Sequence, residues 1–125
     1  MGSQLNLKVS GGEDHNNLEA EIQRLVDTAG WQLQNGDEIQ KTYHCRTWTK
    51  ISDFFTGVAT KCKDVNHHPR VVLDYNSITF FWKTHSPPGL SQKDVHMADF
   101  CDSWAQVVKT VPAGSAPSCS DGNAT

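Results

Sequence analysis

Residues 66–85 read Asn-His-His-Pro-Arg-Val-Val-Leu-Asp-Tyr-Asn-Ser-Ile-Thr-Phe-Phe-Trp-Lys-Thr-His. Two runs within this stretch, 71–75 and 78–82, are rich in the β-branched and aromatic residues that strands prefer. The residues between the runs, Asn76 and Ser77, are turn formers. The stretch therefore predicts a β-hairpin with a two-residue turn.

Histidines stand at both ends of this predicted hairpin. With the turn at its middle, Val71 lies opposite Trp82, and the same register extended backwards places His68 opposite His85. Directly opposed residues of an antiparallel pair have Cβ atoms roughly 5 Å apart. The hairpin therefore predicts that two histidines meet at its open end, with His67 beside them.

Upstream of the hairpin, the pattern predicts one helix, two strands and a second helix. The first helix is capped by Asn16 or Asn17 and stopped by Gly30, a usual residue at a helix C-terminus. Strands at 31–34 and 38–45 follow, joined by the strong hairpin signal Asn-Gly. Lys41 interrupts the apolar face of the second strand.

The second helix covers about 48–63, with Thr47 as its N-cap. Its predicted buried face consists of Trp48, Ile51, Phe55, Val58, Ala59 and Cys62. Phe54 lies on the flank of this stripe, either as part of a wide buried face or as the start of a second packing surface.

The third helix has the densest start signal in the chain. Ser91 is the predicted N-cap, Asp94 the acid of a capping box, and Leu90 with Val95 a hydrophobic staple. Pro112 is predicted to end the helix. Its predicted buried face consists of Met97, Ala98, Cys101, Trp104, Ala105 and Val108.

The element order is therefore α-β-β-α-β-β-α, which predicts an α+β fold. Two consecutive hairpins imply a four-stranded antiparallel sheet. Each of the three helices has one apolar face, and all three bury it most simply against one face of the sheet, which gives a two-layer sandwich. We expect a flexible N-terminal arm over 1–12, a single domain over 13–111 and a disordered tail over 112–125.

Composition excludes several classes of function. The chain has 125 residues, a net charge of −3 and a pI near 6.0, so it lacks the basic footprint of a nucleic-acid-binding protein. No apolar run approaches the roughly 18–20 residues that cross a membrane, and the N-terminus lacks the apolar core of a secretory signal. We therefore expect a cytoplasmic protein whose four cysteines are reduced thiols.

The histidines allow three interpretations. Imidazole titrates near neutral pH, so two or three in one pocket can donate and accept protons in one reaction. Three histidines are also the ligand set of some catalytic zinc sites, but the adjacent His67 and His68 project in different directions if extended, and no acid or cysteine stands at a ligand spacing. Alternatively, His-His-Pro is a polar connector that enters a strand at Pro69.

Several spaced residues together resemble the signature of the pterin-4a-carbinolamine dehydratase family. The positions of this signature are occupied here by Lys63, Asn66, His67, His68, Pro69, Tyr75, His85, Gly89, Leu90, Ser91 and Asp94. The likeness covers roughly 15–110, and the α-β-β-α-β-β-α order agrees with the fold of that family. Three positions depart from the usual pattern: Lys63 replaces an acid of many members, Asn66 replaces an Asp of some, and Val71 replaces a bulky aromatic.

The resemblance implies a hydro-lyase that dehydrates 4a-hydroxytetrahydrobiopterin to quinonoid dihydropterin in tetrahydrobiopterin recycling. By this resemblance His67 and His85 are general acids, and His68 binds the pterin and acts as a base. Pro69 and Asp94 belong to the substrate-binding set, with Asp94 orienting a histidine. No metal or other cofactor is implied.

The resemblance also implies partners. Members of the family form dimers or tetramers, so a homo-oligomer, most simply a homotetramer, is expected. Some relatives act as dimerisation cofactors, or transcriptional coactivators, that bind a helical protein partner. In this chain that alternative function would use the outer face of the second helix, including Phe54, and would add the nucleus as a second compartment.

Overall fold

The computed structural model describes residues 6–114 and contains three helices, a four-stranded sheet and a small two-stranded sheet within that range. In chain order the elements are α1 (His15–Thr28), β1 (Gln32–Gln34), β2 (Glu38–His44), α2 (Trp48–Val65), β3 (Arg70–Leu73), β4 (Ser77–Trp82), β5 (Thr84–His85), β6 (Pro88–Gly89) and α3 (Gln92–Val108).

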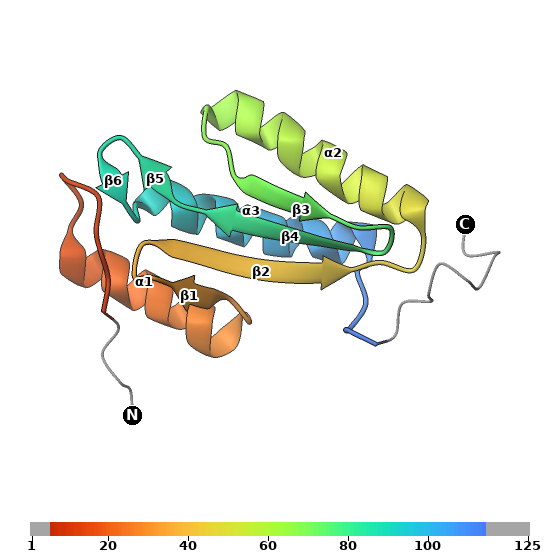
Figure 1. Cartoon of the computed structure of the whole chain (residues 1–125), viewed down its shortest axis with the longest axis horizontal. Coiled ribbons are helices and arrows are strands. Elements are labelled where there is room, and N and C mark those ends of the chain that lie inside the picture. The colour runs from red at the N-terminus through yellow and green to blue at the C-terminus, as the bar shows by residue number, and fades with distance from the viewer. Residues whose placement is uncertain (1–5, 115–125) are drawn as a thin grey trace.

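The main sheet has the strand order β1-β2-β4-β3, and each neighbouring pair is antiparallel. All three helices lie on one side of it, with α3 between α1 and α2 (Figure 1). The predicted α+β two-layer fold is confirmed. The β5–β6 pair was not predicted, because its two-residue strands are too short to leave an alternating pattern.

The histidine hairpin forms, but its turn lies one residue earlier than predicted. Val71 pairs with Phe80 instead of Trp82, and the Asp74 N–H donates to the Ser77 carbonyl at 2.8 Å. Ser77 belongs to β4 because it also pairs with His44 of β2. The neighbouring strand therefore sets the register, and the two-residue change in pairing leaves every side chain on its predicted face.

The ends of the helices follow the predicted capping logic, with local differences. The N-cap of α1 is Asp14, whose carboxylate accepts from the Asn17 N–H, instead of Asn16 or Asn17. Thr47 caps α2 as predicted. The left-handed Lys109 already ends α3, before Pro112.

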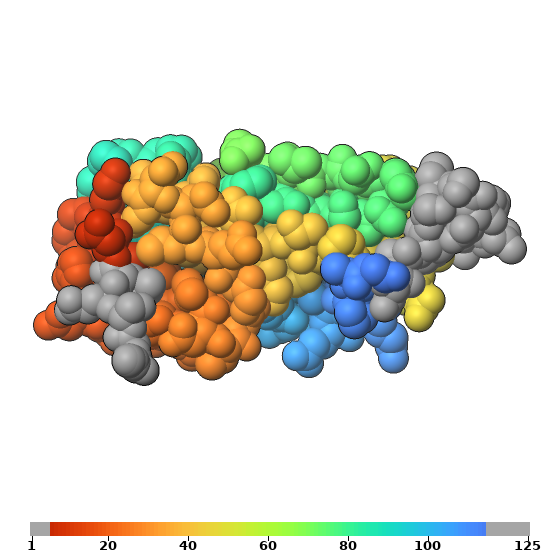
Figure 2. Space-filling view, turned by 60° about the horizontal axis from the view of Figure 1, so that its bottom comes forward, coloured from red at the N-terminus to blue at the C-terminus, as the bar shows by residue number. Residues whose placement is uncertain are grey.

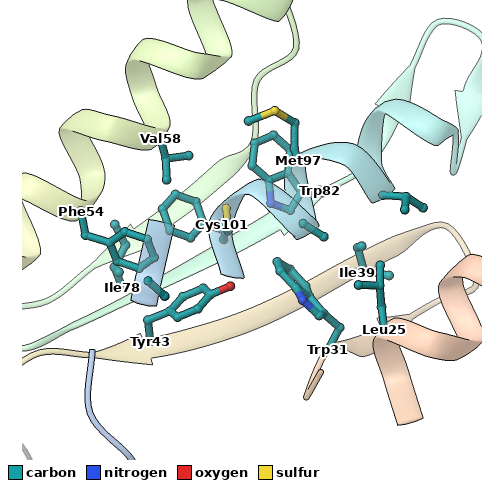
Figure 3. Close-up of a cluster of buried hydrophobic side chains, with 14 of the residues drawn as sticks. Leu25, Trp31, Ile39, Tyr43, Phe54, Val58, Ile78, Trp82, Met97 and Cys101 are labelled. Atoms are coloured by element: carbon teal, nitrogen blue, oxygen red, sulfur yellow. The ribbon is translucent and has the colours of Figure 1, made fainter. Parts of the chain in front are cut away.

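The buried face of α2 is rotated relative to the prediction. Phe54, expected on the flank, is fully buried, whereas Trp48 and Phe55 are 53% and 39% exposed. The Phe54 ring contacts the ring of Tyr43 at a centroid distance of 4.8 Å (Figure 3). It also contacts the ring of Phe80, at a centroid distance of 5.6 Å. Adjacent aromatic residues fit helical periodicity almost equally well, so the aromatic residues of the sheet decide which one is buried.

Lys41 occupies an inward-facing position of β2 because a carboxylate of α3 neutralises it. Its Nζ lies 2.7 Å from Asp102 Oδ1 and donates to the Ala29 carbonyl at 2.6 Å. Tyr43 Oη and Trp31 Nε1 also donate to the Asp102 carboxylate, at 2.6 and 3.0 Å. This network ties β2 to α3 beside the core and explains how a lysine interrupts an apolar face.

Part of the predicted flexible arm is held by the fold. Lys8 N–H donates to the Gly36 carbonyl at 2.6 Å, and Ser10 N–H donates to the Leu90 carbonyl at 2.8 Å. Figure 2 shows this segment, in red, beside the orange β1–β2 hairpin. Lys8 and Ser10 of the expected arm are therefore hydrogen-bonded to the fold. Positions 1–5 of the arm and 115–125 of the predicted tail lie outside the described residues.

Gly89 is where this N-terminal segment packs against the loop that carries β5 and β6. Its φ is +124°, and an added Cβ would lie 2.6 Å from Ser10 N and 2.9 Å from the Lys8 carbonyl oxygen. Gly89→Ala is therefore expected to lower the free energy of unfolding by roughly 2–5 kcal/mol, from backbone strain and a backbone clash.

Urea denaturation measures this loss, and Gly12→Ala is the matched control. Gly12 also has a positive φ, +90°, but nothing lies within 4 Å of its added Cβ. Equal losses in the two variants would show that close packing of the segment contributes nothing.

Buried acidic groups predict a stability that falls in alkali. Burial raises the pKa of the Cys62 thiol to about 11, and it raises the pKa of Cys45, Cys101 and Tyr43 as well. The unfolded chain releases these protons from about pH 8.5 to 10, before the folded protein does. Their contribution is therefore complete below that window and is lost as pH rises towards the folded pKa values.

The expected result is a lower urea midpoint at about pH 10 than at about pH 7.5, in the presence of a reductant. A midpoint that stays constant over this range would contradict the assignment.

Within residues 6–114, no helix combines the length and the apolar character needed to cross a membrane.

Candidate active site

The C-terminus of α2 directs the two adjacent histidines to different environments. Asn66 caps the helix in the left-handed conformation, with φ 57° and ψ 48°, which asparagine tolerates better than most residues. The chain then passes through His67 and His68 to Pro69, directly before β3. His67 is buried, whereas His68 is exposed. The two neighbouring side chains therefore differ in burial, although both line the same pocket.

His67 is held on two sides. Its Nε2 lies 2.6 Å from Asp94 Oδ1, and its ring stacks on Trp82 with centroids 5.8 Å apart and planes 16° apart. Only 8% of the residue is exposed. Packing and hydrogen bonding therefore leave this imidazole little freedom to rotate.

Asp94 is fully buried and accepts three hydrogen bonds. Besides His67, its donors are the Ser91 N–H at 3.0 Å and the Thr84 hydroxyl at 2.9 Å, both on Oδ2. The predicted capping-box acid and the predicted partner of a histidine are thus the same carboxylate. It connects the N-terminus of α3, strand β5 and the end of α2.

His85 reaches the same region from β5. Its backbone pairs with Pro88 of β6, and its side chain is exposed. His67, His68 and His85 all line one open pocket of about 580 Å³. The pocket is lined by Asn66, His67, His68, Pro69, Arg70, Thr84, His85, Ser86 and Lys93.

The structure therefore brings together all three predicted catalytic residues and Pro69. Asp94 is the exception, because its carboxylate does not line the pocket and instead contacts His67. This contact agrees with the histidine-orienting role that the resemblance also implied.

Sequence reasoning missed Thr84, Arg70 and Lys93. Thr84 and Arg70 directly adjoin His85 and Pro69, so proximity in the chain was an available signal. Lys93 is next to Asp94, but its direction depends on how α3 meets β5, which no local pattern specifies.

This arrangement suits proton transfer. A carboxylate only accepts hydrogen bonds, so the proton shared with His67 lies on Nε2, which leaves Nδ1 as an acceptor in the neutral ring. The exposed imidazoles of His68 and His85 are free to approach a bound molecule. Among residues 6–114, no group of three or more His, Cys, Asp or Glu side chains is arranged to hold a metal ion.

Comparison with known proteins agrees with this geometry. A family model described as pterin 4 alpha carbinolamine dehydratase matches residues 15–104. The chain belongs to this family. Dehydratases are hydro-lyases, so the pterin-4a-carbinolamine dehydratase family assigns the chain to that class of enzyme.

Relatives of the chain are bacterial and animal proteins. A protein of Herpetosiphon aurantiacus named for this dehydratase is 35% identical over 80 residues, which cover 64% of this chain and 82% of that protein. A pterin-4-alpha-carbinolamine dehydratase of Drosophila melanogaster is 36% identical over 89 residues. That match covers 70% of this chain but only 46% of the Drosophila protein.

Two solved structures share the fold. A transcriptional coactivator/pterin dehydratase from Brucella melitensis has a TM-score of 0.65 at 24% identity, over 74% of this chain and 96% of that one. A pterin dehydratase-like protein, described as a RuBisCO assembly factor in the α-carboxysome, has a TM-score of 0.53 at 13% identity, over 60% and 88%. At these identities the likeness concerns the fold alone.

Proposed function

We propose that this chain dehydrates the 4a-carbinolamine of a tetrahydropterin to the quinonoid dihydropterin, as a step of tetrahydropterin recycling. One observation carries the proposal: His67, His68 and His85, from two separate segments, line a single pocket. The family of the chain supports the choice of substrate.

The reaction requires two proton movements. The C4a–O bond breaks as the departing hydroxyl takes up a proton and leaves as water. The electron pair of the adjacent nitrogen forms the new C=N bond, and this nitrogen releases its own proton to a base. The atoms balance with one acid and one base, so the proposed mechanism uses no metal or other cofactor.

The contact with Asp94 supports a specific division of roles. Because Nε2 of His67 faces the carboxylate, Nδ1 is the remaining ring nitrogen, and in the neutral ring it accepts a proton. We therefore assign His67 as the base, in place of the general-acid role implied by the resemblance. His85 is the general acid at the departing hydroxyl, and His68 binds the pterin ring.

A dehydration assay tests the proposal. The 4a-carbinolamine is generated enzymatically by an aromatic amino-acid hydroxylase, and its decay is followed in a stopped-flow instrument with and without the purified chain. We expect decay faster than the spontaneous rate and proportional to protein concentration. Decay at the spontaneous rate, at protein concentrations well above that of the substrate, would overturn the proposal.

The alternative function, binding of a helical protein partner, now depends on other residues. Phe54 is buried in the core and is unavailable, but Trp48 and Phe55 on α2 are exposed. We infer that any such partner, or a second copy of the chain in the expected dimer or tetramer, contacts these two aromatic residues. Trp48→Ser with Phe55→Ser would abolish that association, whereas His85→Ala would leave it intact.

A further inference from the structure

The walls of the histidine pocket carry more positive charge than the chain as a whole. Arg70 and Lys93 line the pocket, and none of its lining residues is Asp or Glu. The whole chain, in contrast, has a net charge of −3. Charges of one sign gathered around a concave site raise the local concentration of ligands of the opposite sign.

These two cations have no ion-pair partner within residues 6–114. The nearby carboxylate of Asp94 is fully buried and already accepts three hydrogen bonds. Glu38 lines an adjoining recess with Arg70 and Lys83, but among residues 6–114 it forms no ion pair with either cation. The positive charge of Arg70 and Lys93 is therefore available to a molecule in the pocket.

Arg70 is also held in place. The centre of its guanidinium lies 3.7 Å from the centroid of the Phe81 ring, on the neighbouring strand. Stacking on an aromatic face restricts the side chain, and the planar guanidinium suits two-point contact with carboxylate or phosphate oxygens. An oriented arginine loses less conformational entropy on binding than a free one.

We propose that the pterin bound in this pocket carries an anionic substituent, a carboxylate or a phosphate, which Arg70 and Lys93 recognise. This inference rests on the proposed function for the identity of the ring. It adds the chemical class of the side chain, which the histidines do not determine.

Three stable pterins test the inference by direct binding. The neutral 6-hydroxymethylpterin is compared with its monophosphate ester and with 6-carboxypterin, by calorimetry at low and high salt. A unit charge pair about 4 Å apart in water is worth a factor of about five in affinity. We therefore expect the anionic pterins to bind about fivefold to tenfold more tightly at low salt, and this preference to shrink at high salt.

Charge variants identify the residues responsible. Arg70→Gln and Lys93→Gln are each expected to reduce the preference for the anionic pterins several-fold. Arg70→Lys, which keeps the charge but loses the stacked planar guanidinium, should reduce it less than Arg70→Gln does. Arg46→Gln is the control, because this exposed arginine follows β2 at the opposite end of the sheet from the histidines. A preference unaffected by both glutamine variants, or reduced equally by Arg70→Lys and Arg70→Gln, would overturn the inference.

Binding and turnover together distinguish a phosphate from a carboxylate ligand, and the anion inference from the dehydratase proposal. Preference for the phosphate ester alone, or for the carboxylate alone, supports the inference and names the group. Turnover of a carbinolamine without any anionic preference overturns the inference and leaves the dehydratase standing. An Arg70-dependent preference for the anionic pterins, without turnover of a carbinolamine, supports the inference and overturns the dehydratase. Failure of all three pterins to bind overturns the inference, and the carbinolamine assay alone then decides the dehydratase.

Discussion

His85→Ala is expected to lower kcat for carbinolamine dehydration by about 10²- to 10⁴-fold, the usual contribution of a positioned acid or base. His85 is the proposed donor to the departing hydroxyl, and Ala has no proton to give. The imidazole is exposed, and only the backbone of His85 pairs with Pro88. Truncation should therefore change the free energy of unfolding by no more than about 0.5 kcal/mol.

Single-turnover kinetics with enzymatically generated carbinolamine measure this effect directly. His96→Ala is the matched control, because His96 is an exposed histidine of α3 outside the pocket. It should retain the rate of the unmodified chain. An His85→Ala protein that is folded, binds pterin and still turns over within about threefold of the control would remove His85 from the mechanism.

The sequence predicted the strands and helices well where one local rule sufficed. Thr47 and Ser91 cap α2 and α3 as expected, because capping depends on residues within a single turn. The histidine hairpin was also predicted from local alternation and turn residues, although its turn lies one residue earlier than expected. These features are local, and local patterns are what a single sequence contains.

Features that depend on packing between distant segments were missed. The choice of Phe54 over Phe55 as a core residue depends on Tyr43 and Phe80, which approach only when the sheet has formed. Lys41 interrupts the apolar pattern of β2, and its ion-pair partner, Asp102, lies 61 positions away in the sequence. No spacing rule within either segment relates the two residues.

The candidate site shows the same division. The predicted pairing of His68 with His85 was wrong, because the register of β3 and β4 differs by two residues and His85 belongs to β5, although the histidines line one pocket. The burial of His67 and the exposure of His68 did not follow from the sequence either. That difference arises because Trp82 and Asp94 receive one imidazole and leave the other in solvent. The roles of the histidines are therefore set by their tertiary neighbours.

Asp94→Asn is the substitution that tests this point most directly. The amide has one acceptor oxygen where the carboxylate has two. Facing the Ser91 N–H and the Thr84 hydroxyl, that oxygen preserves two hydrogen bonds, and the NH₂ group then points at His67. Nε2 of His67 must become an acceptor, so its proton moves to Nδ1, and the atom proposed as the base is blocked.

We therefore expect Asp94→Asn to fold with a loss of about 1–2 kcal/mol in stability, since most hydrogen bonds are retained. Its kcat should nevertheless fall by roughly 10²- to 10³-fold, because an imidazole in the wrong tautomer cannot accept the proton. Asp94→Ala leaves three donors without an acceptor and should lower the free energy of unfolding by about 3–5 kcal/mol.

Nitrogen NMR of the His67 ring distinguishes this positioning role from a purely structural one. In the unmodified chain the neutral ring should carry its proton on Nε2, and in Asp94→Asn on Nδ1. A structural role alone predicts a loss of rate that follows the loss of stability and no change of tautomer. If Asp94→Asn keeps the Nε2 proton and still loses activity, Asp94 acts in some way other than through the orientation of His67.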